Sequence, residues 1–322
     1  MQISSKSAVI LTLLATLFWG SNFQATKIAL ESLSSWTASS ERFIIASLLI
    51  VAFATLRGQL SFSTLKKNIF PFIFLGAIGV AGFNGALFLG LQTSHPVTAA
   101  LIMATTPISA NILEAIMRRQ MPQRIRIIGM AISLLGVSIV ITHGKIFAGG
   151  SIAFAPGDII IFVGSLGWSI YTVGTRAMVV ESTPIETTTW TMIFGTFILS
   201  AIAFIQESPI KTLGSASLSS HLADVYMGIA GSVLAYLFWI IGISTRGPGK
   251  TAIFFNFVPL FAIVIQAVLG SMPSYAQLLG AALTIAGVLL GQKKINTSIN
   301  INMESKKSAP DRMKITLSNA MQ

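Results

Sequence analysis

The side chains of this sequence that could bind another molecule are mostly uncharged, and they lie inside long apolar stretches. Trp and Tyr offer ring faces, while Asn and Thr offer neutral hydrogen-bonding groups. Because polar amides are costly in lipid unless they are paired, we expect them to face the interior of a helix bundle. The candidates for lining a solute cavity are Trp19, Asn22, Asn84, Thr105, Thr106, Trp168, Tyr171, Tyr236, Trp239 and Asn256.

Each candidate also has a purely structural interpretation, a satisfied contact between helices. The hydroxyls of Thr105 and Thr106 can bond back to their own helix. Trp239 lies near the end of its apolar stretch, and it equally suits an aromatic belt at a membrane surface. Both interpretations stay open for every residue of the set.

Charged side chains are rare inside the apolar stretches. Arg42 is the one basic residue well inside a stretch, where it either partners Glu41, backbone carbonyls or lipid headgroups, which we favour, or anchors a solute carboxylate. Glu114 stands four residues before Arg118, the spacing of an ion pair on one helix face. Because Glu41, Glu114, Asp158 and Asp224 fall towards the ends of their stretches, we expect no carboxylate at the membrane midplane.

The sequence gives no sign of an enzyme. It has no Cys, its three His are scattered, and no paired carboxylates face one another at helical spacing. It also lacks a glycine-rich phosphate-binding motif. We therefore expect no catalytic residues, no metal, no cofactor and no coupling to ATP, although a proton relay through a His near a membrane boundary stays open.

Composition indicates the elements that must position these residues. The 322 residues are 53% hydrophobic and 10% charged, with a mean hydropathy of +0.78, and a stretch of about 20 apolar residues spans a bilayer as a helix. We expect an all-α integral membrane protein followed by a basic, polar tail over 293–322. The ten expected transmembrane helices are 8–30, 37–56, 69–91, 95–116, 125–142, 157–178, 186–206, 221–243, 250–271 and 274–292.

The distribution of basic residues predicts the orientation. If the N-terminus is cytoplasmic, 17 of the 21 Lys and Arg fall on the cytoplasmic side, as cytoplasmic loops of membrane proteins retain positive charge. We expect both termini in the cytoplasm and the chain in a bacterial inner membrane. The formal charge of +11 then needs no nucleic-acid partner. The expected partners are a small-molecule solute and the lipid bilayer, with the chain as a monomer or weak homodimer.

An internal repeat divides the chain into two halves, 1–142 and 157–292, with five expected helices each. An odd number of helices inserts the second half upside down relative to the first, which makes the halves inverted repeats. Trp19 and Lys27 recur 149 residues later as Trp168 and Arg176. At an offset of 152, Gly76, Asn84, Gly90, Pro96, Ala100 and Pro107 recur as Gly228, Tyr236, Gly242, Pro248, Ala252 and Pro259, and at 151, Gly129 and Gly136 recur as Gly280 and Gly287.

The repeated prolines, Pro107 and Pro259, are candidates for gating. Each removes a backbone donor and frees a carbonyl one turn earlier, so that matched bends would flank one central cavity. Prolines that only shape packing are the alternative. Two similar halves that exchange conformations give alternating access, in which a cavity opens first to one side of the membrane and then to the other.

These residues resemble the EamA branch of the drug/metabolite transporter superfamily over roughly 8–292. The resemblance is carried by the run Phe18–Phe23, by Glu41-Arg42-Phe43, and by the Pro107, Gly129 and Gly136 pattern echoed at Pro259, Gly280 and Gly287. It implies two five-helix repeats and the transport of a small solute. The chain departs from the family at 118–120 and 270–272, where members often carry a Gly-Glu-Arg-like run and this sequence has Arg-Arg-Gln and Gly-Ser-Met.

These observations leave three hypotheses for function. The first is a carrier that exports amino acids or related metabolites by alternating access. The second is a carrier for a quaternary amine or drug-like cation held in an aromatic cage. The third, from a different class, is a membrane scaffold or sensor that transports nothing.

Overall fold

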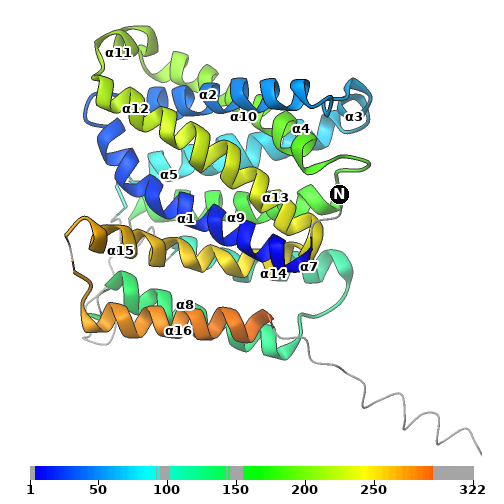
Figure 1. The fold of residues 1–322 in the computed structure, drawn as a ribbon, viewed down its shortest axis with the longest axis vertical. Helices are drawn as coiled ribbons and strands as arrows, with labels where there is room; N and C mark the ends of the chain where they lie inside the picture. The colour runs from blue at the N-terminus through cyan, green and yellow to red at the C-terminus, as the bar shows by residue number, and fades with distance from the viewer. Residues whose placement is uncertain are drawn as a thin grey trace, which may run out of the picture.

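The computed structural model describes residues 4–91, 93–94, 102–142, 144–145, 155–270 and 272–292, and these fold into a bundle of helices (Figure 1). Nine helices within these ranges are long and apolar enough to cross a membrane. Of the expected fourth span, 95–101 lie outside the described residues, and the remainder includes the helix α7, Thr106–Arg118.

The first half of the chain contains α1 (Ser5–Ala29), α2 (Ser35–Leu56), α3 (Phe62–Lys67), α4 (Ile69–Leu75), the π-helix η1 (Gly76–Gly82), α5 (Phe83–Leu91), α7 and α8 (Arg124–Thr142). The second half contains α9 (Pro156–Ala177), α10 (Pro184–Gln206), α11 (Pro209–Ser215), α12 (Leu218–Tyr226), the π-helix η3 (Met227–Leu234), α13 (Ala235–Arg246), α14 (Pro248–Ala252), the 3₁₀ helix η4 (Ile253–Phe257), α15 (Val258–Val268) and α16 (Tyr275–Gln292).

Local signals explain where the helices of the second half begin. Thr183 accepts a hydrogen bond from the backbone N–H of Glu186, whose carboxylate accepts in turn from the N–H of Thr183, and this reciprocal cap starts α10. Asp158 accepts from the backbone N–H of Ala155 at 2.7 Å, as predicted for a carboxylate at a helix N-terminus. The helices α9 and α10 both have Pro at their first position, where the backbone N–H has no partner within the helix.

Two long helices contain a π-helical segment at matching places. η1 joins α4 to α5, and η3 joins α12 to α13. In each segment a glycine meets the backbone of a neighbouring helix: a Cβ on Gly76 would lie 2.5 Å from the carbonyl oxygen of Thr191, and one on Gly228 would lie 3.0 Å from that of Arg42. The wider helical turns therefore lie where two backbones come close together.

The main contacts between helices have counterparts, formed by the helices at the matching places in the other half of the chain. α1 packs against α13 and α15, and α9, its counterpart, packs against α5 and α7. In the same way α2 packs against η3, and α10 packs against η1. The pairs α2–α10 and α8–α16 join counterparts directly. A two-fold arrangement of the halves predicts this set of pairings.

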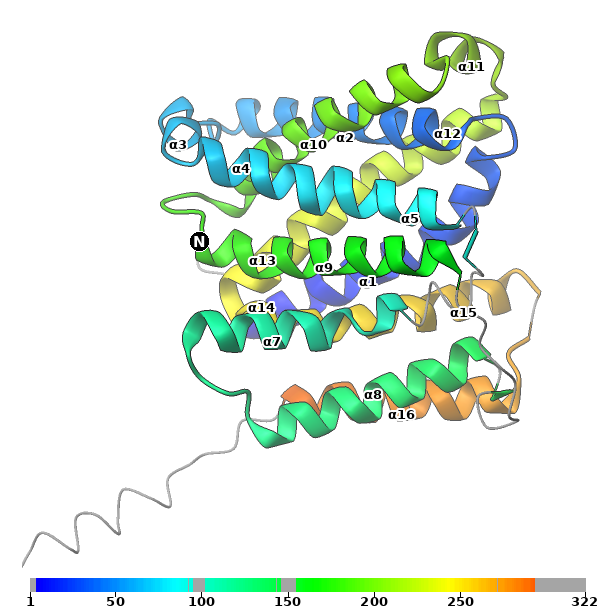
Figure 2. The ribbon, with the colours of Figure 1, turned by 180° about the vertical axis from the view of Figure 1, so that it is seen from behind.

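The helices α8 and α16 meet along glycines, and they form a separate layer at one edge of the bundle (Figure 2). A Cβ on Gly129 would lie 2.6 Å from the carbonyl oxygen of Gly287, and a Cβ on Gly136 would lie 2.6 Å from that of Gly280. Only glycine permits this approach of two backbones, as in other membrane helix pairs. We call this contact the glycine seam.

The bundle has two ends, which lie at opposite edges of Figure 1. The N-terminus, α3 and the connection between α7 and α8 lie at one end, which we call the N-terminal side. α11 and the turn between α15 and α16 lie at the other end, which we call the far side. Because successive spans run in opposite directions, α1, α5, α8 and α15 end on the far side, where α2 and α16 begin.

Candidate solute cavity

A cavity of about 450 Å³ lies among the helices of both halves, a size that suits a small organic molecule. Its walls come from the C-terminal half of α1, from α5 and α15, from the end of α8 and the first turn of α16, and from single residues of α2, α9, α13 and η4. Because α1 and α8 end on the far side and α16 begins there, the cavity extends towards the far side. The lining residues are Trp19, Asn22, Phe23, Gln24, Thr26, Lys27, Arg42, Phe83, Asn84, Leu87, Phe88, Met103, Val140, Ile141, Trp168, Tyr236, Phe255, Val258, Pro259, Ala262, Ile263, Gln266 and Gln277.

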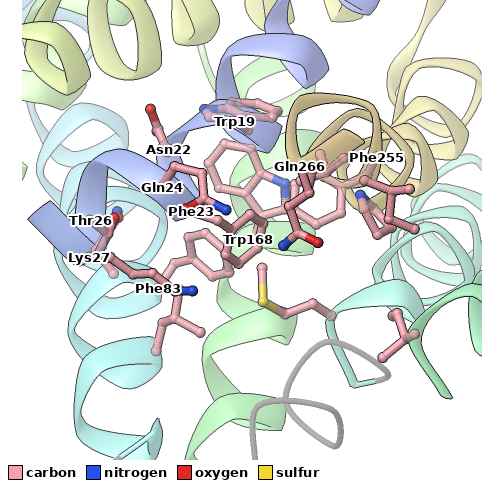
Figure 3. A pocket seen from close by; sticks show the side chains of 18 of the residues that line it. Trp19, Asn22, Phe23, Gln24, Thr26, Lys27, Phe83, Trp168, Phe255 and Gln266 are labelled. Carbon is pink, nitrogen blue, oxygen red and sulfur yellow. The ribbon is translucent and has the colours of Figure 1, made fainter. Parts of the chain in front are cut away.

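Aromatic rings from α1, α9, α13 and η4 meet in the wall of the cavity, and Figure 3 shows those of Trp19, Trp168 and Phe255. Trp19 meets Trp168 edge to face with ring centroids 5.3 Å apart, and it meets Tyr236 and Phe255 at 6.0 and 5.7 Å. Trp168 is stacked against Tyr171 on its other side, at 5.2 Å. Each ring is thus held by its neighbours, which gives a solute a rigid apolar surface.

The carbonyl of Gly231, in the π-helix η3, accepts two hydrogen bonds at the cavity wall. The indole Nε1 of Trp19 donates at 2.9 Å, and Nη2 of Arg42 donates at 3.3 Å. Nε of Arg42 also donates to the hydroxyl of Ser232 at 2.9 Å. With its side-chain amide oriented to satisfy both neighbours, Asn22 donates to the carbonyl of Phe18 and accepts from Arg42. The guanidinium is therefore fixed in place while it lines the cavity.

Asn84 and Tyr236, which occupy matching positions in the two halves, touch each other. The amide Nδ2 of Asn84 donates to the Tyr236 hydroxyl at 3.3 Å and to the carbonyl of Val80 at 2.7 Å. Trp19 and Trp168 are likewise a matched pair in contact. Residues at matching positions meet where a two-fold axis passes, so the cavity lies on the axis that would relate the halves.

The charge of the cavity is one-sided. Lys27 and Arg42 line it, and none of its described lining residues is acidic. Trp168 lines it too, and its indole N–H has no hydrogen-bond partner among the described residues. Two cations beside aromatic rings form a surface that complements a carboxylate attached to an apolar group, and the unused, buried N–H belongs to one of those rings.

The sequence-predicted residues fall into two groups. Trp19, Asn22, Arg42, Asn84, Trp168, Tyr236 and Pro259 line the cavity. The others, Thr105, Thr106, Pro107, Tyr171, Trp239 and Asn256, are not among its lining residues.

Several residues of the second group bond to neighbouring helices. Trp239 donates to the Thr172 hydroxyl at 3.2 Å, and its ring supports that of Trp19. Asn256 donates to the hydroxyl of Ser133 at 2.9 Å, and the Thr105 hydroxyl bonds back to the carbonyl of Ile102. These contacts match the structural interpretation, in which polar groups join helices.

Both repeated prolines stand where a helix restarts. Pro107 lies in the first turn of α7, directly after a turn at Thr105. Pro259 lies in the first turn of α15, after the 3₁₀ segment η4. Pro259 borders the cavity, whereas Pro107 is buried away from it. The two prolines thus occupy matching sequence positions but unlike surroundings.

Polar contacts close the N-terminal side of the bundle. The carboxylate of Glu114 pairs with Arg118 at 3.1 Å and with Arg126 at 3.7 Å, and it accepts from the backbone N–H of Gly249 at 2.8 Å. Asn111 donates to the carbonyl of Gly249 at 3.0 Å. The predicted pairing of Glu114 with Arg118 is present, and the same carboxylate also bridges the two halves of the chain.

Sequence reasoning passed over five polar residues that line the cavity, Gln24, Thr26, Lys27, Gln266 and Gln277, and the internal repeat marks the last three. Lys27 was visible as the partner of Arg176 in the repeat but was not connected with binding. Gln266 follows Glu114 by 152 residues, and Gln277 follows Arg126 by 151, the offsets found for their helices. The repeat was the signal that could have found these three residues. A polar residue at the closed end of one half predicts a polar residue at the matching place in the other half.

Comparison with known proteins supports this architecture. The model of the EamA-like transporter family matches the chain twice, at 6–142 and at 155–291. An uncharacterized transporter of Bacillus subtilis, YyaM, is 33% identical over 85% of this chain and 90% of its own length. A probable terminal-alkyne amino-acid exporter of Streptantibioticus cattleyicolor is 25% identical over 88% and 92%.

A solved crystal structure shares the fold with a TM-score of 0.76 at 20% identity, over 90% of this chain and 97% of that one. Two matches of one family model, on the two halves of the chain, agree with the matching helix contacts described above. With nine apolar helices in its described part, this multi-pass membrane protein belongs to the EamA-like transporter family.

Proposed function

We propose that this chain is a carrier that exports small carboxylate-bearing solutes, amino acids or related metabolites, by alternating access. The observation that carries the proposal is the cavity, in which Lys27 and Arg42 stand beside an aromatic surface. A carboxylate bonded to a guanidinium gains charge-assisted hydrogen bonds, and an apolar side chain gains contact with the rings. An amino acid of moderate size has both parts.

The open and closed ends of the bundle support alternating access. The cavity extends to the far side, while Glu114, Arg126 and Gly249 join the two halves on the N-terminal side. A carrier of two inverted halves, 1–142 and 157–292, reaches its second state when the halves exchange conformations. We place the N-terminal side in the cytoplasm of a bacterial cell, on the distribution of basic residues, so the described state faces outwards.

Among the relatives, the probable terminal-alkyne amino-acid exporter favours an amino acid as the class of solute and export as the direction. Its 25% identity extends over nearly all of both chains. The cavity of this chain agrees with that class, because a zwitterion brings the carboxylate that Arg42 and Lys27 complement.

A quaternary amine is the second candidate, favoured by the rings of Trp19, Trp168, Tyr236 and Phe255 around one space. Such cages bind cations through the ring faces. The two positive side chains at the cavity argue against a cation, because like charges repel most strongly where water is scarce.

The test is transport by the purified full-length protein in proteoliposomes. L-Phenylalanine carries a carboxylate and a ring, choline carries a quaternary ammonium, and each is supplied as a radiolabelled probe. We expect saturable counterflow of L-phenylalanine and none of choline. Counterflow of choline alone would favour the aromatic cage, and counterflow of neither, nor of other amino acids, would favour a scaffold or sensor.

A further inference from the structure

A cluster of ionisable side chains lies beside the cavity, between α2 and α12, and takes no part in the solute site described above. Oε1 of Glu41 lies 2.7 Å from Nδ1 of His221. Asp224, one turn further along α12, is 0% exposed, and neither of its carboxyl oxygens has a hydrogen-bond partner among the described residues. Oε2 of Glu41 is also buried without a partner there. Burying an ionised carboxylate without hydrogen-bond donors costs free energy, so a role other than stabilising the fold has to account for these carboxyl groups.

Hydrogen-bond geometry places one proton in the cluster. The other ring nitrogen of His221, Nε2, lies 3.2 Å from the carbonyl oxygen of Leu213. Both ring nitrogens thus face oxygen atoms, but a neutral imidazole carries only one N–H. Either the imidazole holds both protons, or the carboxyl of Glu41 is protonated and donates to Nδ1. A neutral His221 and an ionised Glu41 together lack one proton for these contacts. Satisfying both contacts therefore needs one additional proton on this pair.

The neighbours of Asp224 show what a further proton would do. Within the described part of the chain, Glu41 and Arg42, both on α2, are the charged groups that act on its carboxyl. α1 presents Ala25 and Ala29 to this part of α12. Two neighbouring ionised carboxylates repel each other, and no donor among the described residues bonds to Asp224 or to Oε2 of Glu41. A single proton shared by Glu41 and Asp224 removes one charge and supplies the missing hydrogen bond.

Exposure falls along the cluster from the far side inwards. The side chain of His221 is 30% exposed, that of Glu41 is 16% exposed, and Asp224 is fully enclosed. Arg42 follows, and it lines the solute cavity. Ionisable groups therefore follow one another from water on the far side to the cavity, and groups of these types can relay protons in membrane proteins.

We propose that the Glu41–Asp224 carboxyl pair is a proton-binding site, filled from the far side through His221 and coupled through Arg42 to the binding of a solute carboxylate in the cavity. This rests on the proposed function for its second part only. The transfer moves one proton from water to the pair, and no other bond changes. With both carboxylates ionised, the pair weakens the attraction that Arg42 and Lys27 exert on an anionic group, whereas one bound proton removes a negative charge and strengthens that attraction.

The sign of the coupling follows from this change in attraction. Proton binding favours the binding of a solute carboxylate, and by linkage the bound carboxylate favours the proton. The carrier therefore moves the proton and the solute together, and the sum of the two gradients sets the net direction. Export then runs down a solute gradient that exceeds the opposing proton gradient.

Two measurements on the purified full-length protein test the site and the coupling separately. Infrared difference spectra recorded across a pH titration detect the carbonyl stretch of a protonated carboxyl group, without any solute. Binding of L-phenylalanine, followed at a series of pH values in sodium-free and sodium-containing buffers, reports the coupling. The variants are Asp224→Asn and Glu41→Gln, which keep the shape of each side chain, with Glu31→Gln as the control at an exposed carboxyl on the same side.

We expect the carboxyl band to titrate in the wild type and in Glu31→Gln and to be lost in Asp224→Asn. The affinity for L-phenylalanine should fall by up to about tenfold per pH unit on the alkaline side, the limit for one linked proton, and it should be independent of pH in both cluster variants. A titrating band that persists in Asp224→Asn and Glu41→Gln, or affinity that depends on sodium instead of pH, overturns the proposal. If the band behaves as expected but the wild type binds no amino acid, the proton site stands and the proposed function fails.

Discussion

Trp19 and Trp168 stand 149 residues apart in the chain and meet edge to face at 5.3 Å, at matching positions of the two halves. Their indole N–H groups are used differently. That of Trp19 donates to the carbonyl of Gly231, whereas that of Trp168 has no partner among the described residues. A symmetric pair of rings thus has one donor bonded to the protein and one unused, buried donor, and the ring that carries the unused donor lines the cavity.

Replacing Trp168 with Phe should weaken solute binding. The change keeps an aromatic ring and removes the N–H, which we expect to bond to the solute carboxylate at about 1.5–3 kcal/mol, or roughly a tenfold rise or more in KM. Trp190→Phe is the matched control, since its indole N–H is also buried and unpartnered in the described structure, but it does not line the cavity. Counterflow kinetics in proteoliposomes measure both. Equal effects of the two changes would remove Trp168 from the binding site.

The orientation can be measured with single Cys residues, because the natural sequence has none. Gly214→Cys places the thiol on the far side, where a Cβ at this position would meet nothing within 4 Å, and Gln123→Cys places it on the exposed connection of the N-terminal side. An impermeant thiol reagent should label the first variant and not the second in intact cells. Labelling of Gln123→Cys alone would reverse the proposed orientation.

Gly136→Ala should destabilise the glycine seam. The added methyl group would lie 2.5 Å from the backbone nitrogen of Thr284, so α8 and α16 must separate, at a cost of about 1–3 kcal/mol. Gly214→Ala is the control, because its Cβ would have no neighbour within 4 Å. Thermal unfolding in detergent should show a lower midpoint for Gly136→Ala only. An unchanged midpoint would show that the two helices are free to shift apart.

Glu114→Gln should loosen the closed end. The carboxylate bridges Arg126 and the backbone of Gly249, and an amide lacks the charge for the first contact. The state that faces the far side should become less populated, so that a reporter thiol at Leu87, in the cavity wall, is labelled more slowly from that side.

The control for this change is Glu181→Gln, on the same side of the bundle. The ammonium of Lys67 lowers the pKa of the Glu181 carboxyl through a hydrogen bond, but the pair is exposed, and exposed ion pairs contribute little. Labelling at Leu87 should be unchanged in this variant. Slower labelling in both variants would show that losing any negative charge on this side has the same effect, and that the bridge formed by Glu114 has no special role.

Much of the fold could be predicted from the sequence, because a lipid environment allows few choices. The expected helices 8–30 and 37–56 correspond to Ser5–Ala29 and Ser35–Leu56, and charge and hydropathy alone were enough to place them. The π-helical segments η1 and η3 were missed. They follow from close contact with another helix, and apolar sequence has no signal for such a contact.

The site was less predictable than the fold. Repetition and residue type indicated Trp19, Trp168 and Tyr236, all of which line the cavity, but neither can tell which face of a helix is turned towards it. The sequence predicted that Asp224 lies towards the end of a span, and it gave no indication that the side chain is buried. The residue is close to the start of α12 in sequence, yet α1 and α2 cover it completely, and that cover depends on tertiary packing.

The two ends of the solute path differ in their chemistry, although their positions match. On the N-terminal side the contact is ionic, between Glu114 and Arg126, while the matching residues at the open end are the neutral Gln266 and Gln277. Closing the far side therefore gains amide contacts where closing the N-terminal side gains charge-assisted ones. We expect an idle, unloaded carrier to wait with its cavity towards the far side. The return of the unloaded carrier to the opposite state is then the rate-limiting step of the transport cycle.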